Sequence, residues 1–206
     1  KPGGAVWWME DPMQNLYGRP ALPLPGWVSL HSRTNYRSPH EILRYLNRML
    51  PAAQAIDAGS PLAGFEVEIF TYADHDGLVA TTKKALNRAI SLGYKRKMIA
   101  LVSYRGKQES ALSGCEQLGN YRLKSFTGKY DLFGSPVYSP GDILFESVYR
   151  YKGQSAPCVV LTEIDFDTLD EKALRKLFVG ITRATMKLLL VMSDRAAAKL
   201  GGYARS

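Results

Sequence analysis

The sequence predicts an α/β protein with a mostly parallel sheet and helices on both faces of that sheet. Strand-sized runs of almost continuous apolar residues alternate with amphipathic segments of helical period, which is typical of parallel sheets buried on both sides. The chain has 206 residues, 46% of them hydrophobic and 22% charged, enough to build a sizeable core. No apolar run approaches the ~20 residues that span a bilayer, so we expect no membrane contact and a cytoplasmic location.

The first thirty residues are expected to hold two short strands joined by a linker. Residues 5–9 (Ala-Val-Trp-Trp-Met) predict a buried strand, which Glu10-Asp11-Pro12 ends. A loop rich in proline and glycine follows at 18–26, a composition that favours a linker between two lobes. Residues 27–30 predict the second strand.

A helix is predicted to begin at Ser38 and to end before Pro51. Ser38 is a suitable N-cap, Pro39 suits the first helical position, and Glu41 completes a capping box. Apolar residues then recur on one helical face.

The remaining segments alternate between strand and helix and complete the predicted sheet. The segment around 113–141 is rich in Gly, Tyr and Ser and is expected to be a small variable insertion with short strands, such as one at 121–126. The other expected strands are 65–72, 97–104, 143–149, 158–164 and 187–192, and the expected helices are 78–92, ended by Gly93, and 170–181.

The charge and the cysteines bear on the kind of partner and the compartment. A net charge of +8 favours an anionic partner, with nucleic acid as the leading candidate. Cys115 and Cys158 stand far apart without Cys-x-x-Cys spacing, and with three histidines the chain predicts no metal site. Two free thiols fit a reducing cytoplasm.

Two arginines stand where phosphate-facing cations are expected. Arg37 precedes the first predicted helix, and Arg183 follows the last one and precedes a strand. The chain nevertheless has no G-x-x-x-x-G-K-[ST] loop to cradle a phosphate. The sequence therefore predicts half of a nucleotide site, with the other half on a different polypeptide segment.

Three segments can carry this chemistry, and each has a plainer reading. Tyr36-Arg37 can stack on a base and reach a phosphate, or it can be a core tyrosine beside a surface arginine. The segment 147–154 (Ser-Val-Tyr-Arg-Tyr-Lys-Gly-Gln) can hold a phosphate and stack a base, or it can be a solvated turn. Arg183 can be an arginine finger, or it can cap the carbonyls at the end of a helix.

Taken in order, these segments resemble the conserved C-terminal motifs of superfamily I DNA helicases of the UvrD/Rep/PcrA type. Tyr36-Arg37-Ser38 is similar to the fourth motif, 147–153 to the fifth and 178–184 to the sixth, while 10–17 resembles the third. The resemblance implies a RecA-like P-loop NTPase fold that lacks its own P-loop. It assigns 1–26 to the end of a first motor lobe and a linker, and 27–206 to a compact second lobe without the large accessory insertion.

The resemblance also implies roles for individual residues. Arg37 and Arg183 would contact the γ-phosphate of ATP across the cleft between two lobes, with Gln14 linking that phosphate to the DNA path. Tyr36 would stack on adenine. The remaining residues are the nucleotide-side positions Gly153 and Ser155 and the DNA-binding positions Ser147, Tyr149, Arg150, Lys152 and Arg105.

The implied protein is an ATP-dependent DNA helicase that moves 3′ to 5′ and works in settings such as DNA repair. Its cofactors would be ATP and Mg²⁺, neither held by this chain alone. Its partners would be DNA, single-stranded or at a duplex junction, and the N-terminal RecA-like lobe of the same protein. This chain by itself is expected to be inactive, because the phosphate loop and the acidic Mg²⁺ motif are absent from it.

The sequence departs from the family pattern at three positions and leaves two other functions open. Glu10 replaces a glycine, Tyr149 a histidine, and Ser155 an acidic residue that touches the ribose. One alternative is a nucleic-acid-binding or protein-docking module that kept the fold and lost the motor. The other is an unrelated α/β enzyme in which Asp165 and Asp167 bind a metal.

Overall fold

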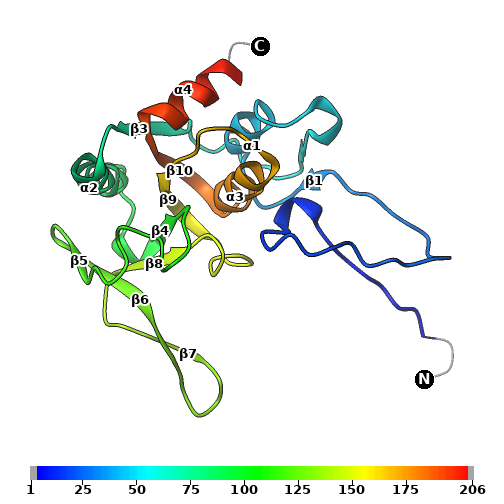
Figure 1. Ribbon diagram of the computed structural model, residues 1–206, viewed down its shortest axis with the longest axis horizontal. Helices are drawn as coiled ribbons and strands as arrows, with labels where there is room; N and C mark the ends of the chain where they lie inside the picture. The colour runs from blue at the N-terminus through cyan, green and yellow to red at the C-terminus, as the bar shows by residue number, and fades with distance from the viewer. Residues whose placement is uncertain (1–3, 204–206) are drawn as a thin grey trace.

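The computed structural model describes residues 4–203, and within them one large sheet contains eight strands (Figure 1). These are β3 (Glu68–Tyr72), β4 (Ile99–Ser103), β5 (Gln117–Leu118), β6 (Tyr121–Tyr130), β7 (Pro136–Tyr138), β8 (Ile143–Ser147), β9 (Ala156–Ile164) and β10 (Ala184–Ser193). Their order is β3-β10-β9-β4-β8-β6-β5, with β7 paired to β6. The pairings from β3 to β6 are parallel, and β5 and β7 are antiparallel to β6.

Helices cover both faces of this sheet, as the sequence predicts. The α-helices are α1 (His40–Asn47), α2 (His75–Ser91), α3 (Glu171–Ile181) and α4 (Asp194–Tyr203), and the short 3₁₀ turns are η1 (Pro12–Gln14), η2 (Ala52–Gln54) and η3 (Arg96–Met98). Neighbouring strand residues point to opposite faces, so Leu161 packs in one buried cluster with α1 and α3, while Val160 packs in the other with α2. The α/β prediction is confirmed.

The central strands are buried because they consist almost entirely of apolar residues. Every residue of β4 is buried, and so is every residue of β9 except Pro157. Burying each such side chain stabilises the fold by roughly 1.5–3 kcal/mol. Edge strand β3, which the sequence predicts at 65–72, begins at Glu68 and alternates between half-buried and exposed residues.

Two of the four α-helices, α2 and α3, begin with the aspartate caps that favour a helix start. Asp170 accepts a hydrogen bond from the amide of Ala173 at 2.7 Å and starts α3. Asp74 accepts one from the amide of Gly77 at 2.8 Å, so α2 starts three residues before the predicted position. Gly93, at φ +90°, ends α2 as predicted.

The predicted capping box of α1 is wrong. No side chain caps this helix. Ser38 is buried, and its hydroxyl donates to the main-chain oxygen of Thr182 at 3.3 Å instead. Glu41 forms an ion pair with Arg44. The side chain of Asn35 organises the turn, because its Oδ1 accepts from the amides of Arg37 and Ser38 at 2.8 and 2.9 Å.

The two strands predicted near the N-terminus are also wrong. Residues 5–9 and 27–30 form no strand, and Trp7 and Val28 are 72% and 87% exposed. A strand needs hydrogen-bonding neighbours, and no described segment of the chain pairs with either run. A short parallel pair, β1 (Thr34–Asn35) with β2 (Asp57–Ala58), lies further along the chain and is absent from the predictions.

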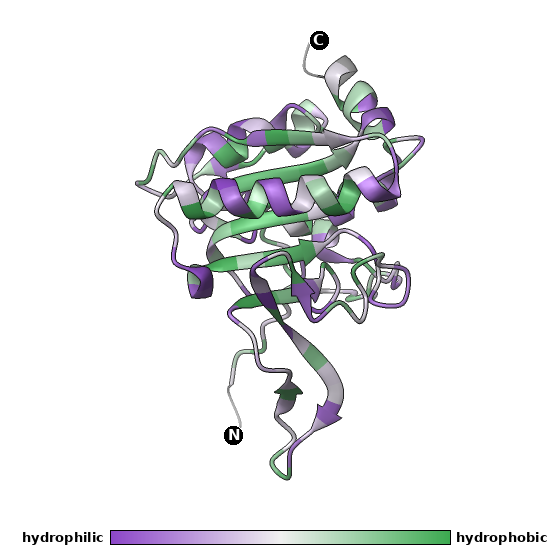
Figure 2. Ribbon diagram, turned by 90° about the vertical axis from the view of Figure 1, so that its left-hand side faces the viewer, coloured by the Kyte–Doolittle hydropathy of each residue, from purple (hydrophilic) through white to green (hydrophobic). Residues whose placement is uncertain are grey.

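The predicted insertion around 113–141 contains the short strand β5, which pairs with the start of β6, and a β-hairpin that projects from the body of the molecule (Figures 1 and 2). The first strand of the hairpin is β6, longer than the predicted 121–126, and β7 returns antiparallel to it. Gly141 follows, and a Cβ placed there would lie 2.4 Å from the main chain of Leu123.

The structure does not test the predicted boundary between two lobes at residue 26. None of the described helices is both long enough and apolar enough to span a membrane.

Candidate nucleotide and nucleic-acid site

Four of the predicted site residues line one pocket of about 570 Å³ beside the amino end of β10. Arg37 and Arg183 are separated by most of the chain and meet here, together with Tyr36 and Gln14. The walls come from four places: the η1 segment, the stretch around β1, residues 54–56 at the end of η2, and the end of α3. Ser155 and Gly153 do not line this pocket.

Arg183 is 2% exposed and is held by the elements around it. Its Nε donates to the main-chain oxygen of Val179 at 3.0 Å and its Nη2 to the Thr182 hydroxyl at 3.1 Å. Its Nη1 donates to the main-chain oxygen of Gln154 at 3.4 Å. The arginine therefore caps α3, as its plainer reading predicts, while still lining the pocket.

The positive charge of Arg37 affects the guanidinium of Arg183. Burial is the main reason why the pKa of its guanidinium is lowered to about 10, and repulsion from Arg37 is the second. Asp11 opposes this shift. Two guanidinium groups that repel each other across a pocket form a local positive field, which an anion would relieve.

Arg37 and Tyr36 reach the pocket from the turn that Asn35 organises. Tyr36 is 75% exposed, so its reading as a core tyrosine is wrong. Within the described residues, the side chain of Arg37 has no hydrogen bond or ion pair. A Cβ at Gly59 would lie 2.6 Å from the ring of Tyr36, so this glycine allows the ring to lie against the main chain.

Gln14 lies at the end of η1, which Asp11 caps. Asp11 accepts from the amide of Met13 at 3.0 Å, and the side-chain nitrogen of Gln14 donates to its other oxygen at 2.7 Å. Leu16 anchors the segment because it is buried in the core cluster beside α3. The side chain of Gln14 is thus positioned by its own turn.

The loop from 148 to 155 runs between the side of the sheet where the parallel strands end and the side where they begin. Strands β8 and β9 are both parallel to β4, so this loop must run from the carboxyl end of one to the amino end of the other. The amide of Val148 donates to Ser103 at 2.7 Å and that of Tyr151 to Ser147 at 2.9 Å. Gly153 turns the chain at φ +87° just before Gln154 reaches Arg183. Ser155 is exposed.

A second pocket, of about 430 Å³, contains Tyr149 and Tyr17. The centroids of their rings lie 5.7 Å apart. Arg175 of α3 also lines the pocket, and its Nη1 donates to the main-chain oxygen of Asn15 at 3.4 Å. Nearby cations are Lys172 in the wall, Arg19 at 5.6 Å from the Tyr17 ring centroid and Lys176 at 5.9 Å from that of Tyr149.

Three other residues of the predicted DNA loop lie apart from both pockets. Arg150 places its guanidinium 3.6 Å from the ring centroid of Phe126 in the hairpin and pairs with Glu146 at 3.2 Å. Lys152 is exposed. Ser147 is buried at the end of β8.

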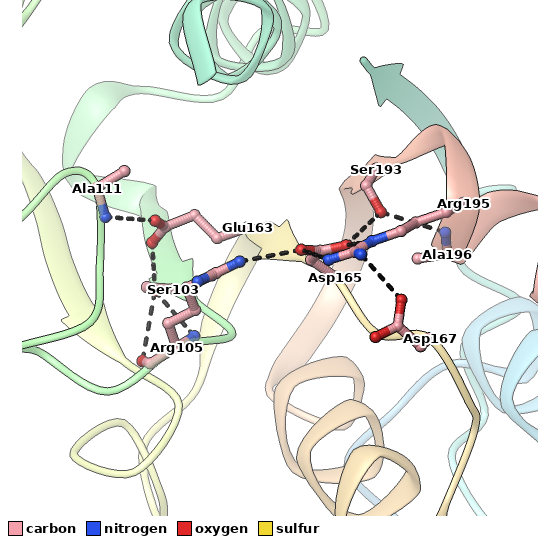
Figure 3. A network of polar contacts seen from close by, with 9 residues as sticks. All are labelled: Ser103, Arg105, Ala111, Glu163, Asp165, Asp167, Ser193, Arg195 and Ala196. Atoms are coloured by element: carbon pink, nitrogen blue, oxygen red, sulfur yellow. Dashed lines mark hydrogen bonds and ion pairs between the residues drawn. The ribbon is translucent and has the colours of Figure 1, made fainter. Parts of the chain in front are cut away.

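Arg105 lies at the carboxyl edge of the sheet, in the polar network of Figure 3. Its Nη2 donates to Asp165 at 3.0 Å, and Arg195 binds the same carboxylate. The hydrogen bond from Arg195, followed by one from Ser193, lowers the pKa of Asp165 to about 2. Asp167 also pairs with Arg195, at 2.8 Å. Both aspartates are thus engaged by arginine, and no described group of three or more His, Cys, Asp or Glu residues could hold a metal ion.

Glu163 is the residue that sequence reasoning missed. It is fully buried and takes the left-handed conformation, φ +61°. Its carboxylate accepts from Ser110 at 2.6 Å, from the amide of Ala111 at 2.7 Å and from Ser103. An acidic residue inside an otherwise apolar strand was the signal that could have identified it.

Part of the chain matches a known protein family, and its fold is similar to that of a solved structure. Residues 142–191, which run from β8 almost to the end of β10, match the family described as UvrD-like helicase C-terminal domain. The chain is similar to the crystal structure of the C-terminal domain of a possible DNA helicase from Lactobacillus plantarum WCFS1, with 18% sequence identity and a TM-score of 0.55. That likeness covers 79% of this chain and 92% of the other. No curated protein matches.

The structural similarity establishes the fold, a mixed α/β domain with a mostly parallel sheet like that of a helicase C-terminal domain. The matched segment contains the loop between β8 and β9 and the end of α3. The similarity to a UvrD-like helicase C-terminal domain thus rests on residues 142–191 in sequence and on the fold in structure.

Proposed function

We propose that this chain is the C-terminal motor lobe of an ATP-dependent DNA helicase or translocase. It supplies Arg37 and Arg183 to an ATP site shared with an N-terminal RecA-like lobe, and it carries part of the track for single-stranded DNA. The observation that carries the proposal is the convergence of two distant arginines on one pocket, together with Tyr36 and Gln14.

The residues of this pocket fit a nucleoside triphosphate. ATP supplies the transferable γ-phosphoryl group, and the cations stabilise the charge that develops on it. Tyr36 offers an exposed ring for the base. Arg37 is available for a phosphate. The three acceptors of Arg183 are neutral oxygens, and a phosphate would compete with them because charge-assisted hydrogen bonds are stronger.

We assign the phosphate loop and the Mg²⁺ ligands to the N-terminal lobe. This chain has no G-x-x-x-x-G-K-[ST] loop, and its described residues offer no cluster suited to a metal ion. The exposed apolar segment 5–9, with Val6 76% and Met9 89% exposed, would add a strand to that lobe. The chain alone would then hydrolyse no ATP.

The pocket around Tyr17 and Tyr149 is the proposed site for bases of single-stranded DNA. Aromatic rings offer stacking surfaces, and surrounding cations attract the phosphates. Lys172 in the pocket wall and Lys176 beside the Tyr149 ring provide positive charge, while Arg175 in the same wall is paired with Glu171. The other proposed contacts to the strand are those of Ser147, Lys152 and Arg105.

Two short segments connect the proposed nucleotide and DNA sites. The first carries Gln14 in one pocket and Tyr17 in the other, three residues apart. The second is the loop between β8 and β9, with Tyr149 at one end and Gln154 against Arg183 at the other. A bound DNA strand that moves Tyr149 would thus displace the main-chain oxygen of Gln154, which accepts from Arg183. Conversely, a bound phosphate that draws Arg183 toward it would free the loop from this hydrogen bond.

The test is ATP hydrolysis by the complete protein with Arg37→Ala or Arg183→Ala. Each change should lower kcat by on the order of a thousandfold, with DNA binding nearly intact. Arg44→Ala is the matched control, because Arg44 is an exposed arginine on α1 whose ion pair is with Glu41. Hydrolysis that survives both changes would overturn the proposal and favour a non-motor nucleic-acid-binding module.

A further inference from the structure

The β6–β7 hairpin has a well-ordered tip. Asp131 closes it, because its Oδ1 accepts from the amides of Phe133 and Ser135 at 2.9 and 2.8 Å. The main chain of Asp131 also bonds to that of Ser135 and Gly134. Gly134 allows the turn with φ +76°. The side chains at the tip are therefore presented in a defined conformation without help from the body of the molecule.

The side chains presented at this tip are apolar and almost fully exposed. Leu132 is 100% exposed, Phe133 93% and Tyr130 60%, and Figure 2 shows the end of the hairpin in the colours of hydrophobic residues. Single exposed apolar residues need no explanation, but neighbouring ones held at the end of a projecting element indicate a binding surface.

The first strand of the hairpin carries positive charge along its length. Lys129 lies next to the tip, and Arg122 and Lys124 lie at the start of β6, where it pairs with β5 and β8. Asp131 at the tip is already used within its own turn. Lys124 lies 5.3 Å from the ring centroid of Tyr138. Cations interleaved with aromatic rings are typical of surfaces that follow a nucleic-acid backbone and stack its bases.

The base of the hairpin is joined to the proposed DNA loop. Arg150, to which the family resemblance gives a DNA-binding role, places its guanidinium over the ring of Phe126 and pairs with Glu146. Lys107, two residues after Arg105, donates to the main-chain oxygen of Phe126 at 2.7 Å. Both loops that carry proposed DNA-binding residues are thus tied to the same point of the hairpin.

We propose that the hairpin tip, with Leu132 and Phe133, binds unpaired bases of DNA, and that Arg150 positions the hairpin. This inference rests on the proposed function, since it extends the single-strand track beyond the Tyr17–Tyr149 pocket. Apolar side chains commonly insert between bases. The positive strand and the link to the DNA loops favour DNA over a protein partner as the occupant.

The test uses the complete protein and a DNA with a duplex junction and a single-stranded tail. The fluorescent base 2-aminopurine is placed in the unpaired tail beside the junction, and binding is followed by its emission and by anisotropy. The double variant Leu132→Ser/Phe133→Ser should bind about tenfold more weakly and lose the emission change. Both side chains are exposed, so the fold should be retained. Leu92→Ser, an exposed leucine just after α2, is the matched control.

Two further variants distinguish a failure of this inference from a failure of the proposed function. Tyr149→Ala should also weaken binding, whereas Arg150→Gln should weaken it only through the hairpin and should add little to the double variant. If Tyr149→Ala weakens binding and the tip variant does not, the hairpin inference is wrong and the proposed function stands. If no form of the protein binds DNA at low salt, both are wrong. A tip variant that loses a protein partner but keeps its DNA affinity also overturns the inference.

Discussion

The Nη1 atom of Arg183 donates a hydrogen bond to the main-chain oxygen of Gln154, 3.4 Å away. This contact joins the buried arginine at the end of α3 to the loop that carries Tyr149 on the other edge of the sheet. Gly153 sets the direction of the chain immediately before it, with φ +87°.

The contact predicts that Gly153→Ala will weaken the coupling between DNA and ATP hydrolysis. No atom lies within 4 Å of the added methyl group, so the strain is that of the backbone alone, roughly 1–2 kcal/mol. Relief of this strain would turn the carbonyl of Gln154 away from Arg183. Stimulation of hydrolysis by single-stranded DNA should fall several-fold. Gly93→Ala is the control, with φ +90° and equally open surroundings, and should leave the stimulation unchanged.

Gly59→Ala should weaken ATP binding through Tyr36. The new methyl group would lie 2.6 Å from Thr34 Cγ2 and from the ring of Tyr36, so the ring must move. Loss of an aromatic stack corresponds to roughly 0.5–1.5 kcal/mol, which predicts a KM for ATP raised about twofold to twelvefold with a smaller change in kcat. Gly201→Ala, with open surroundings, serves as the control. An unchanged KM would mean that the ring of Tyr36 does not meet the base.

Asp165 should contribute stability that is lost in acid. Hydrogen bonds from Arg195 and Ser193 lower its pKa from 3.8 to about 2. A carboxyl group with a lowered pKa stabilises the fold above its unfolded pKa, and this contribution disappears as the pH falls from about 4 to 2. Because Arg195 is 57% exposed, the effect is discounted to about 1–2 kcal/mol.

Denaturant unfolding between pH 2 and pH 6 provides the measurement. Asp165→Asn should flatten the decline in the free energy of unfolding between about pH 4 and pH 2. Asp167→Asn is the control, because that carboxylate is 81% exposed and binds a single arginine. A decline that is equally steep in both variants would assign the acid sensitivity to other carboxyl groups.

Glu163→Leu should be much more damaging than Glu163→Gln. Leucine would leave the amide of Ala111 without its side-chain acceptor and the buried hydroxyl of Ser110 without its own, at a cost of about 1–3 kcal/mol for the buried hydroxyl alone. Glutamine keeps one oxygen for this amide, and the hydroxyls of Ser103 and Ser110 can rotate to accept from its nitrogen. The measurement is denaturant unfolding combined with hydrogen exchange at Ala111, where protection should be lost in the leucine variant only.

The sheet could be predicted because its strands carry their own signal. The apolar run of β9 and the Asp170 cap of α3 depend on residues within a few positions, and both lie close to their predicted places. The run at 5–9 has an equally apolar composition and forms no strand. Composition makes a strand possible, but partners are what stabilise it, and the described chain offers none.

The site was predictable only in part, for a similar reason. The sequence indicates Arg37 and Arg183 as phosphate ligands, and the structure places both in one pocket. Two of the three acceptors of Arg183 are main-chain oxygens, which no residue type reveals. Ser38 has the sequence of a cap, but its hydroxyl bonds to Thr182 across the fold. Contacts between distant segments decide both cases, and they follow from the folded topology.

The hairpin leaves the sheet along β6 and returns along β7, so that Gly141 passes against the main chain of Leu123 before β8 begins. The segments that enter and leave the hairpin therefore lie side by side, and the residues between Tyr130 and Pro136 are not constrained by pairing with the sheet. A longer excursion, even an independently folding module, could replace the tip without changing the register of β8. The connection between β6 and β7 is thus a position at which segments of different length can be inserted while the rest of the lobe keeps its architecture.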